Sequence, residues 1–176
     1  MPAGTLFDYT TGKDLVYMTY SPYNGGNVFA ILKDPVDGKH WLARFTFGAS
    51  IAQVYYEEMT ATDIENAGSF AVSPEFGYVM YNVGAKLYSY DFNNKASKQM
   101  ADYGSRSISM LKFHNFIFGK YATMANQLIV CSYDEGNTAS SGKMEMFTVK
   151  PVQGDFELAR EYTGLGKIVS LSYRER

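Results

Sequence analysis

The fold is indicated most clearly by residues 78–91, YVMYNVGAKLYSYD, in which two short apolar and aromatic runs flank Gly84. Tyrosine and valine are favoured in strands because their side chains pack well on a half-buried, pleated surface. Glycine accepts a positive φ without a Cβ clash, so it suits the tight turn of a hairpin. The stretch therefore predicts two antiparallel strands, at residues 77–82 and 86–91.

The pattern of this hairpin recurs along the chain, with Gly38 and Gly142 in places that correspond to Gly84. Each glycine precedes an alternating segment that begins with lysine. The dipeptide Ser-Pro, at residues 21–22 and 73–74, marks the same point of the first two units. A repeat of roughly 40 to 50 residues that contains four strands is typical of a propeller blade. The predicted strands cover residues 14–20, 28–32, 39–47 and 51–58 in the first unit, 69–72, 77–82, 86–91 and 98–103 in the second, and 107–113, 127–133, 143–149 and 156–162 in the third.

These strands predict an all-β, propeller-like fold of about three four-stranded blades, with one short helical turn within residues 60–67. A further inner strand is predicted at residues 167–173, where apolar and polar residues alternate. The alternative is a β-sandwich, since its strands have similar spacing. Three blades and one strand do not close a ring. We therefore expect a single β domain over residues 1–176 that is the C-terminal part of a larger protein, or a homodimer that completes the ring.

The composition excludes several classes of protein. Hydrophobic residues form 46% of the 176 residues and charged residues 19%, a balance typical of folded chains and not of disordered ones. The 16 Lys and Arg against 18 Asp and Glu give a net charge of −2, which provides no basic surface for nucleic-acid phosphates. No nucleic-acid partner is expected.

No stretch of the sequence approaches the roughly 18 apolar residues of a membrane span, and the N-terminus lacks the pattern of a signal peptide. No membrane-spanning segment is therefore expected in this sequence. Cys131 is the single cysteine, so no disulfide forms within the chain.

The motifs that carry chemistry favour no catalytic residue, metal or cofactor. The segment 164–167, GLGK, precedes a β-branched run, whereas a phosphate-binding loop precedes a helix. Cys131 and His114 have the side chains of a catalytic thiol and its base. However, Cys131 lies within a predicted strand, where free cysteine is commonly a buried apolar residue. The adjacent Glu57 and Glu58 point to opposite faces of a strand, so they cannot act together as a glycosidase pair.

Aromatic residues near loops are the best candidates for ligand contacts. Sugar rings present apolar faces that stack on aromatic planes, and nearby amide or carboxylate groups bind the hydroxyls. Loops at the rim of a scaffold carry binding residues more often than the strands beneath them. The predicted ligand-binding residues are Tyr20, Tyr23, Asn24, Tyr121 and Asp134.

Three segments resemble a known family: residues 163–176, TGLGKIVSLSYRER; residues 69–74, SFAVSP; and residues 83–91, VGAKLYSYD. They are similar to the C-terminal, propeller-like region of the PKD-like lipoproteins of Bacteroidetes. The resemblance implies a lipoprotein of the cell envelope, outer-membrane-anchored or extracellular, with a lipoprotein signal and PKD-type modules before this region. It also implies a link to a membrane only through a lipid anchor that is absent from this chain. It supplies no catalytic residues.

Together these observations predict a non-enzymatic binding or scaffolding module of a cell-surface lipoprotein, with a glycan or a protein as its partner. The alternative is a glycoside hydrolase or lyase, since propellers also carry such enzymes and a fold does not define a function. Two carboxylates that face one cleft would favour the enzyme.

Overall fold

The protein is described by a computed structural model, which covers residues 12–21, 27–47, 51–73, 77–116, 125–150 and 155–172. These residues form twelve β-strands and two single 3-10 turns, Ile64–Asn66 and Glu135–Asn137. The all-β prediction is confirmed, as is the short helical turn expected within residues 60–67. Within the described ranges, no helix has the length and apolar character needed to cross a membrane.

The first sheet is an antiparallel meander in sequence order, β1-β2-β3-β4. The turn between β2 and β3 is tight because Gly38 has a φ of 75° and its backbone N donates to the carbonyl O of Asp34 at 2.9 Å. Its strands are β1 (Asp14–Ser21), β2 (Asn27–Lys33), β3 (His40–Phe47) and β4 (Ile51–Glu58).

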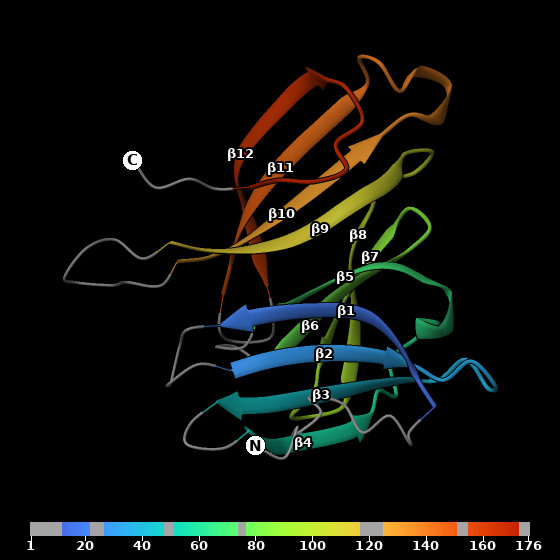
Figure 1. Ribbon diagram of the computed structural model, residues 1–176. Coiled ribbons are helices and arrows are strands. Elements are labelled where there is room, and N and C mark those ends of the chain that lie inside the picture. The colour runs from blue at the N-terminus through green and yellow to red at the C-terminus, as the bar shows by residue number, and fades with distance from the viewer. Residues whose placement is uncertain are drawn as a thin grey trace. The chain divides into compact units, whose positions relative to one another are not determined.

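The second and third sheets repeat this design, in the orders β5-β6-β7-β8 and β12-β11-β10-β9 (Figure 1). No strand crosses from one sheet to another within the part of the chain that is described. Their strands are β5 (Ala67–Ser73), β6 (Tyr78–Val83), β7 (Lys86–Asp91) and β8 (Ala96–Asp102), then β9 (Ser107–Phe116), β10 (Ala125–Tyr133), β11 (Gly142–Val149) and β12 (Phe156–Leu165). All twelve strands of the three predicted units are therefore present.

The chain divides into two compact units, Met1–Glu65 and Asn66–Arg176. In the second unit, apolar residues of two sheets form one core. Burial of these side chains is the main force that holds the two sheets together. The core residues are Ala71, Tyr78, Met80, Leu87, Leu111, Leu128, Val130, Phe147 and Val149.

The predicted terminal strand at residues 167–173 is wrong for the residues that are described, because 167–172 lie in no strand. Their polar groups are satisfied in another way. The Lys167 backbone N donates to the carbonyl O of Thr138 at 2.8 Å, and the Lys112 Nζ donates to the carbonyl O of Leu171 at 2.6 Å. The Lys167 ammonium also lies 4.4 Å from the centre of the Tyr133 ring. Side-chain and loop contacts thus replace the ladder that an inner strand requires.

Gly142 differs from the other two glycines of the predicted repeat. Gly38 and Gly84 have positive φ values of 75° and 56°, as hairpin glycines should. Gly142 instead begins β11 and lies against the backbone of Leu165 and Gly166. Its missing side chain allows a close approach of two backbone segments and is not needed for a turn.

Candidate functional site

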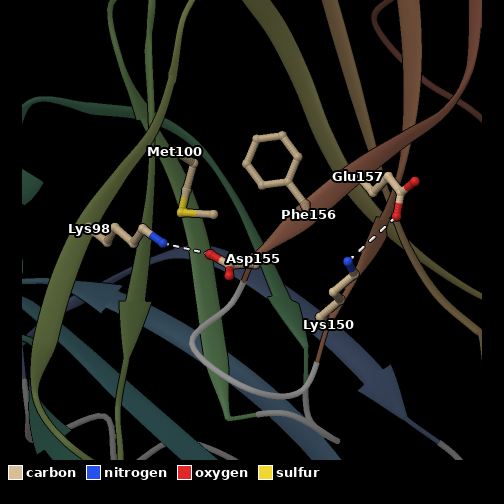
Figure 2. A pocket seen from close by; sticks show the side chains of 6 residues that line it. All are labelled: Lys98, Met100, Lys150, Asp155, Phe156 and Glu157. Atoms are coloured by element: carbon tan, nitrogen blue, oxygen red, sulfur yellow. Dashed lines mark hydrogen bonds and ion pairs between the residues drawn. The ribbon is translucent and has the colours of Figure 1, made fainter.

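The described residues of the second unit line an open surface pocket of about 450 Å³. It lies where the start of β8 faces the end of β11 and the start of β12 (Figure 2). The backbone N of Lys150 donates to the carbonyl O of Asp155 at 2.7 Å, which draws the ends of β11 and β12 together. The lining residues are Lys98, Met100, Lys150, Asp155, Phe156 and Glu157.

Two ion pairs form the polar part of the pocket. The Lys98 Nζ donates to the Asp155 Oδ1 at 2.6 Å, and the Lys150 Nζ lies 3.5 Å from the Glu157 Oε2. Figure 2 shows each lysine reaching toward its carboxylate from a different segment of the chain. The Lys98 ammonium holds the pKa of Asp155 below its ordinary value. Asp155 is therefore an ionised hydrogen-bond acceptor at neutral pH.

Met100 and Phe156 form the apolar part. The Phe156 ring meets the Phe147 ring edge to face, with 4.5 Å between the ring centres. The Ser89 hydroxyl donates to the Met100 sulfur at 3.2 Å. Both apolar side chains are thus anchored to the core, which makes this side of the pocket rigid. A rigid apolar surface beside fixed donors and acceptors suits a ligand with both apolar and polar faces.

The structure describes two of the five predicted ligand-binding residues, and neither lines this pocket. Tyr20 lies on β1 in the first unit and is exposed. The Asp134 Oδ1 accepts a hydrogen bond from the Gly136 backbone N at 2.9 Å and caps the turn Glu135–Asn137. This is the ordinary local role of a turn aspartate. Tyr23, Asn24 and Tyr121 lie outside the described residues.

Sequence reasoning missed all six pocket residues. A signal was present in the charged and apolar residues that alternate at 155–157, Asp-Phe-Glu, next to Lys150. The partner segment, β8, lies more than fifty residues earlier, and nothing in the sequence alone pairs the two.

Among the residues that the structure describes, no group of three or more His, Cys, Asp or Glu side chains is arranged to hold a metal ion. The side chain of His114, the base that a catalytic pair with Cys131 would need, lies outside the described part. Cys131 itself is fully buried on β10, and burial raises the pKa of its thiol to about 11. A buried, protonated thiol is a poor nucleophile.

We expect Cys131 to react with a thiol reagent at pH 8 only when the protein unfolds, because the reagent needs an accessible thiolate. The measurement is the rate of labelling by a chromogenic disulfide in buffer and in denaturant. Labelling in buffer should follow the unfolding rate. Labelling as fast as that of a free thiol would contradict the buried position.

The same thiol should make the protein sensitive to alkali. Its folded pKa of about 11 lies above the ordinary 9.0, so its contribution to the free energy of unfolding is complete below pH 9 and is lost between pH 9 and about 11. The loss reaches about 3 kcal/mol. Denaturant titrations across this range should show a shallower decline for Cys131→Ala. Equal declines would contradict the assignment.

Comparison with models of known protein families found no match, and comparison with curated proteins found none.

Proposed function

We propose that this chain is a non-enzymatic binding module and that its pocket binds a neutral glycan. The observation that carries the proposal is the combination of a rigid apolar surface, Met100 and Phe156, with two lysine and carboxylate pairs in one pocket. Pyranose rings have an apolar C–H face and a rim of hydroxyls. The apolar face would pack on Phe156, and the hydroxyls would form hydrogen bonds with Lys98 and Asp155.

The proposal includes a propeller-like arrangement in which each sheet is one blade. Three meanders of four consecutive strands support it, because a blade has this connectivity and a Greek-key sandwich exchanges strands between sheets. The position of the pocket at strand ends also agrees with the usual location of binding sites on such scaffolds.

The resemblance of residues 163–176, 69–74 and 83–91 to the PKD-like lipoproteins supports a location in the cell envelope, as part of a surface lipoprotein. A glycan ligand suits such a location. A protein partner at the same surface, with the chain in a scaffolding role, is the alternative if none of the glycans tested below binds.

One observation bears on the alternative of a glycoside hydrolase: Asp155 and Glu157 line the same pocket. A hydrolase uses two carboxyl groups, one of which needs a raised pKa to donate a proton. The pKa of Asp155 is instead lowered by Lys98, and Glu157 lies beside Lys150. Carboxylates held in ion pairs serve better as hydrogen-bond acceptors than as acids, which favours binding over hydrolysis.

We expect Lys98→Ala and Asp155→Ala each to weaken glycan binding by roughly tenfold or more, since each removes a group that forms a charged hydrogen bond with the sugar hydroxyls. Binding would be measured by isothermal titration with neutral oligosaccharides of glucose, mannose, galactose and xylose. The matched control is Lys39→Ala, which removes the exposed Lys39 and Glu58 pair of the first unit and should leave affinity unchanged.

Three results would overturn the proposal. Binding that survives both pocket substitutions would move the site elsewhere on the chain. Release of reducing sugar from any of these oligosaccharides, lost in Asp155→Asn, would establish the hydrolase. No heat of binding with any of them would remove the neutral glycan as ligand.

A further inference from the structure

The two ion pairs of the pocket leave one ammonium and one carboxylate near each other without a direct bond. Lys150 pairs with Glu157, and Lys98 pairs with Asp155. No ion pair among the described residues joins Lys150 to Asp155, although the Lys150 backbone N donates to the Asp155 carbonyl O at 2.7 Å. The Lys98 ammonium, and to a smaller extent that of Lys150, lower the pKa of the Asp155 carboxyl. A ligand group can therefore lie between a donor, Lys150, and an acceptor, Asp155.

The charged side chains of the pocket bind some polar groups more selectively than others. An ammonium only donates hydrogen bonds, and an ionised carboxylate only accepts them. A sugar hydroxyl both donates and accepts, so it can bind to either of them. A secondary amide in the trans form has its N–H and its C=O on opposite sides of one plane. It therefore needs an acceptor on one side and a donor on the other, as Asp155 and Lys150 provide.

Met100 adds an apolar contact beside this acceptor. The register of β8 shifts between its pairs with Leu87 and Tyr88, which leaves Met100 without an opposite residue. A bulge of this kind re-aims a side chain and is common next to functional sites. Figure 2 shows Met100 beside Asp155, on the side of the pocket away from Lys150. The thioether of methionine is flexible and polarisable, so it packs well against a small apolar group such as a methyl.

We infer that the pocket prefers a glycan of N-acetylated hexosamine, whose acetamido group lies between Lys150 and Asp155. The N–H donates to the Asp155 carboxylate, and the C=O accepts from the Lys150 ammonium. In a trans amide the methyl group lies on the same side as the N–H, which directs it to Met100. The sugar ring packs on Phe156 as in the proposed function, on which this inference rests.

The first test compares two tetrasaccharides with the same β-1,4-linked backbone, tetra-N-acetylchitotetraose and cellotetraose. They differ only in the group at carbon 2 of each ring, which is an acetamido group in the first and a hydroxyl in the second. We expect isothermal titration to give a dissociation constant roughly tenfold or more smaller for the acetylated compound. The reason is that both hydrogen bonds of the amide involve charged groups and its methyl is covered by Met100.

A variant of Lys150 tests which group holds the amide. Lys150→Ala should bring the ratio of the two dissociation constants close to one, because the carbonyl loses its donor. The fold should be unaffected, since the Lys150 and Glu157 side chains are 59% and 74% exposed and such surface pairs contribute little to stability. The matched control is Lys98→Ala, which should weaken both tetrasaccharides and preserve their ratio.

The predicted position of the methyl group can be observed directly. In the bound complex, the acetyl methyl protons should show a nuclear Overhauser effect to the methyl of Met100. The chain has nine methionines. The Met100 signal is identified by its absence in Met100→Leu, which keeps an apolar side chain of similar volume.

The outcomes separate this inference from the proposed function. Equal affinities for the two tetrasaccharides would overturn the inference and leave glycan binding in place. A preference that survives Lys150→Ala would also overturn it, as would a bound complex without the effect at Met100. Binding of neither compound would overturn the proposed function and the inference together.

Discussion

Gly142→Ala is expected to destabilise the second unit by about 3 kcal/mol, because the new methyl group has no space. An ideal Cβ at this position would collide with the carbonyl O of Gly166 and lie 2.6 Å from the carbonyl O of Leu165. These are backbone atoms, so no side chain can rotate away. Relief requires that β12 and the segment after it move off β11. The midpoint of thermal unfolding of this unit should fall by roughly 6 to 12 °C.

The matched control for this substitution is Gly166→Ala, on the opposite side of the same contact. There a Cβ would lie 3.5 Å from the carbonyl O of Ala139, an ordinary van der Waals distance. The φ of Gly166 does not lie in the left-handed region, so alanine brings no backbone strain. Calorimetry should find this variant close to the parent in stability. Equal stability of both variants would show that residues 165–166 do not lie against Gly142.

The twelve strands were predictable because their information is local. In the second sheet, for example, the alternation at residues 86–91 predicts a strand, and the glycine at position 84 predicts the turn before it. The structure has both, with a positive φ at Gly84. The predicted and observed strands differ mainly in their first and last residues. The three meanders follow because each strand pairs with the next one along the chain.

Features that depend on distant residues were not predictable. The segment 167–172 alternates like a strand, yet its contacts go to Thr138, Lys112 and Tyr133, which belong to other elements. The pocket likewise depends on the approach of Lys98 to Asp155. Gly142 resembled a turn glycine because a sequence shows the absence of a side chain and not the reason for it.

A charged cluster lies at the other end of the third sheet, where β11 begins and β12 ends. The Lys143 Nζ lies 2.9 Å from the Glu145 Oε1 and 2.8 Å from the Glu161 Oε2. Glu145 is buried and lies opposite Glu161 in the register of β11 and β12. Burial and the Glu145 carboxylate raise the pKa of Tyr103, which therefore stays neutral beside them. Lys143 is thus the cation that compensates a buried carboxylate.

Lys143→Met should therefore destabilise this unit by about 3 kcal/mol, since removal of one partner leaves a buried charge without compensation. The midpoint of thermal unfolding should fall by roughly 6 to 12 °C at pH 7. The double variant Lys143→Met/Glu145→Gln should recover most of the loss, because the amide removes the buried charge that Lys143 compensates. A double variant as unstable as the single one would mean that Lys143 stabilises by packing alone.

The pH dependence of the destabilisation by Lys143→Met provides an independent check, because the destabilisation should become smaller at high pH. Glu161 and then Glu145 raise the pKa of Lys143 above its ordinary 10.5. A raised pKa means that the lysine stabilises the fold fully below about pH 10.5 and loses this contribution as the pH rises through its folded value. The difference in unfolding free energy between the parent and Lys143→Met should thus be constant from pH 7 to 9 and shrink above pH 10.5. Because Cys131 titrates in both proteins, its effect cancels in this difference. A gap that stays constant as the pH rises above 10.5 would contradict the ion pair as its source.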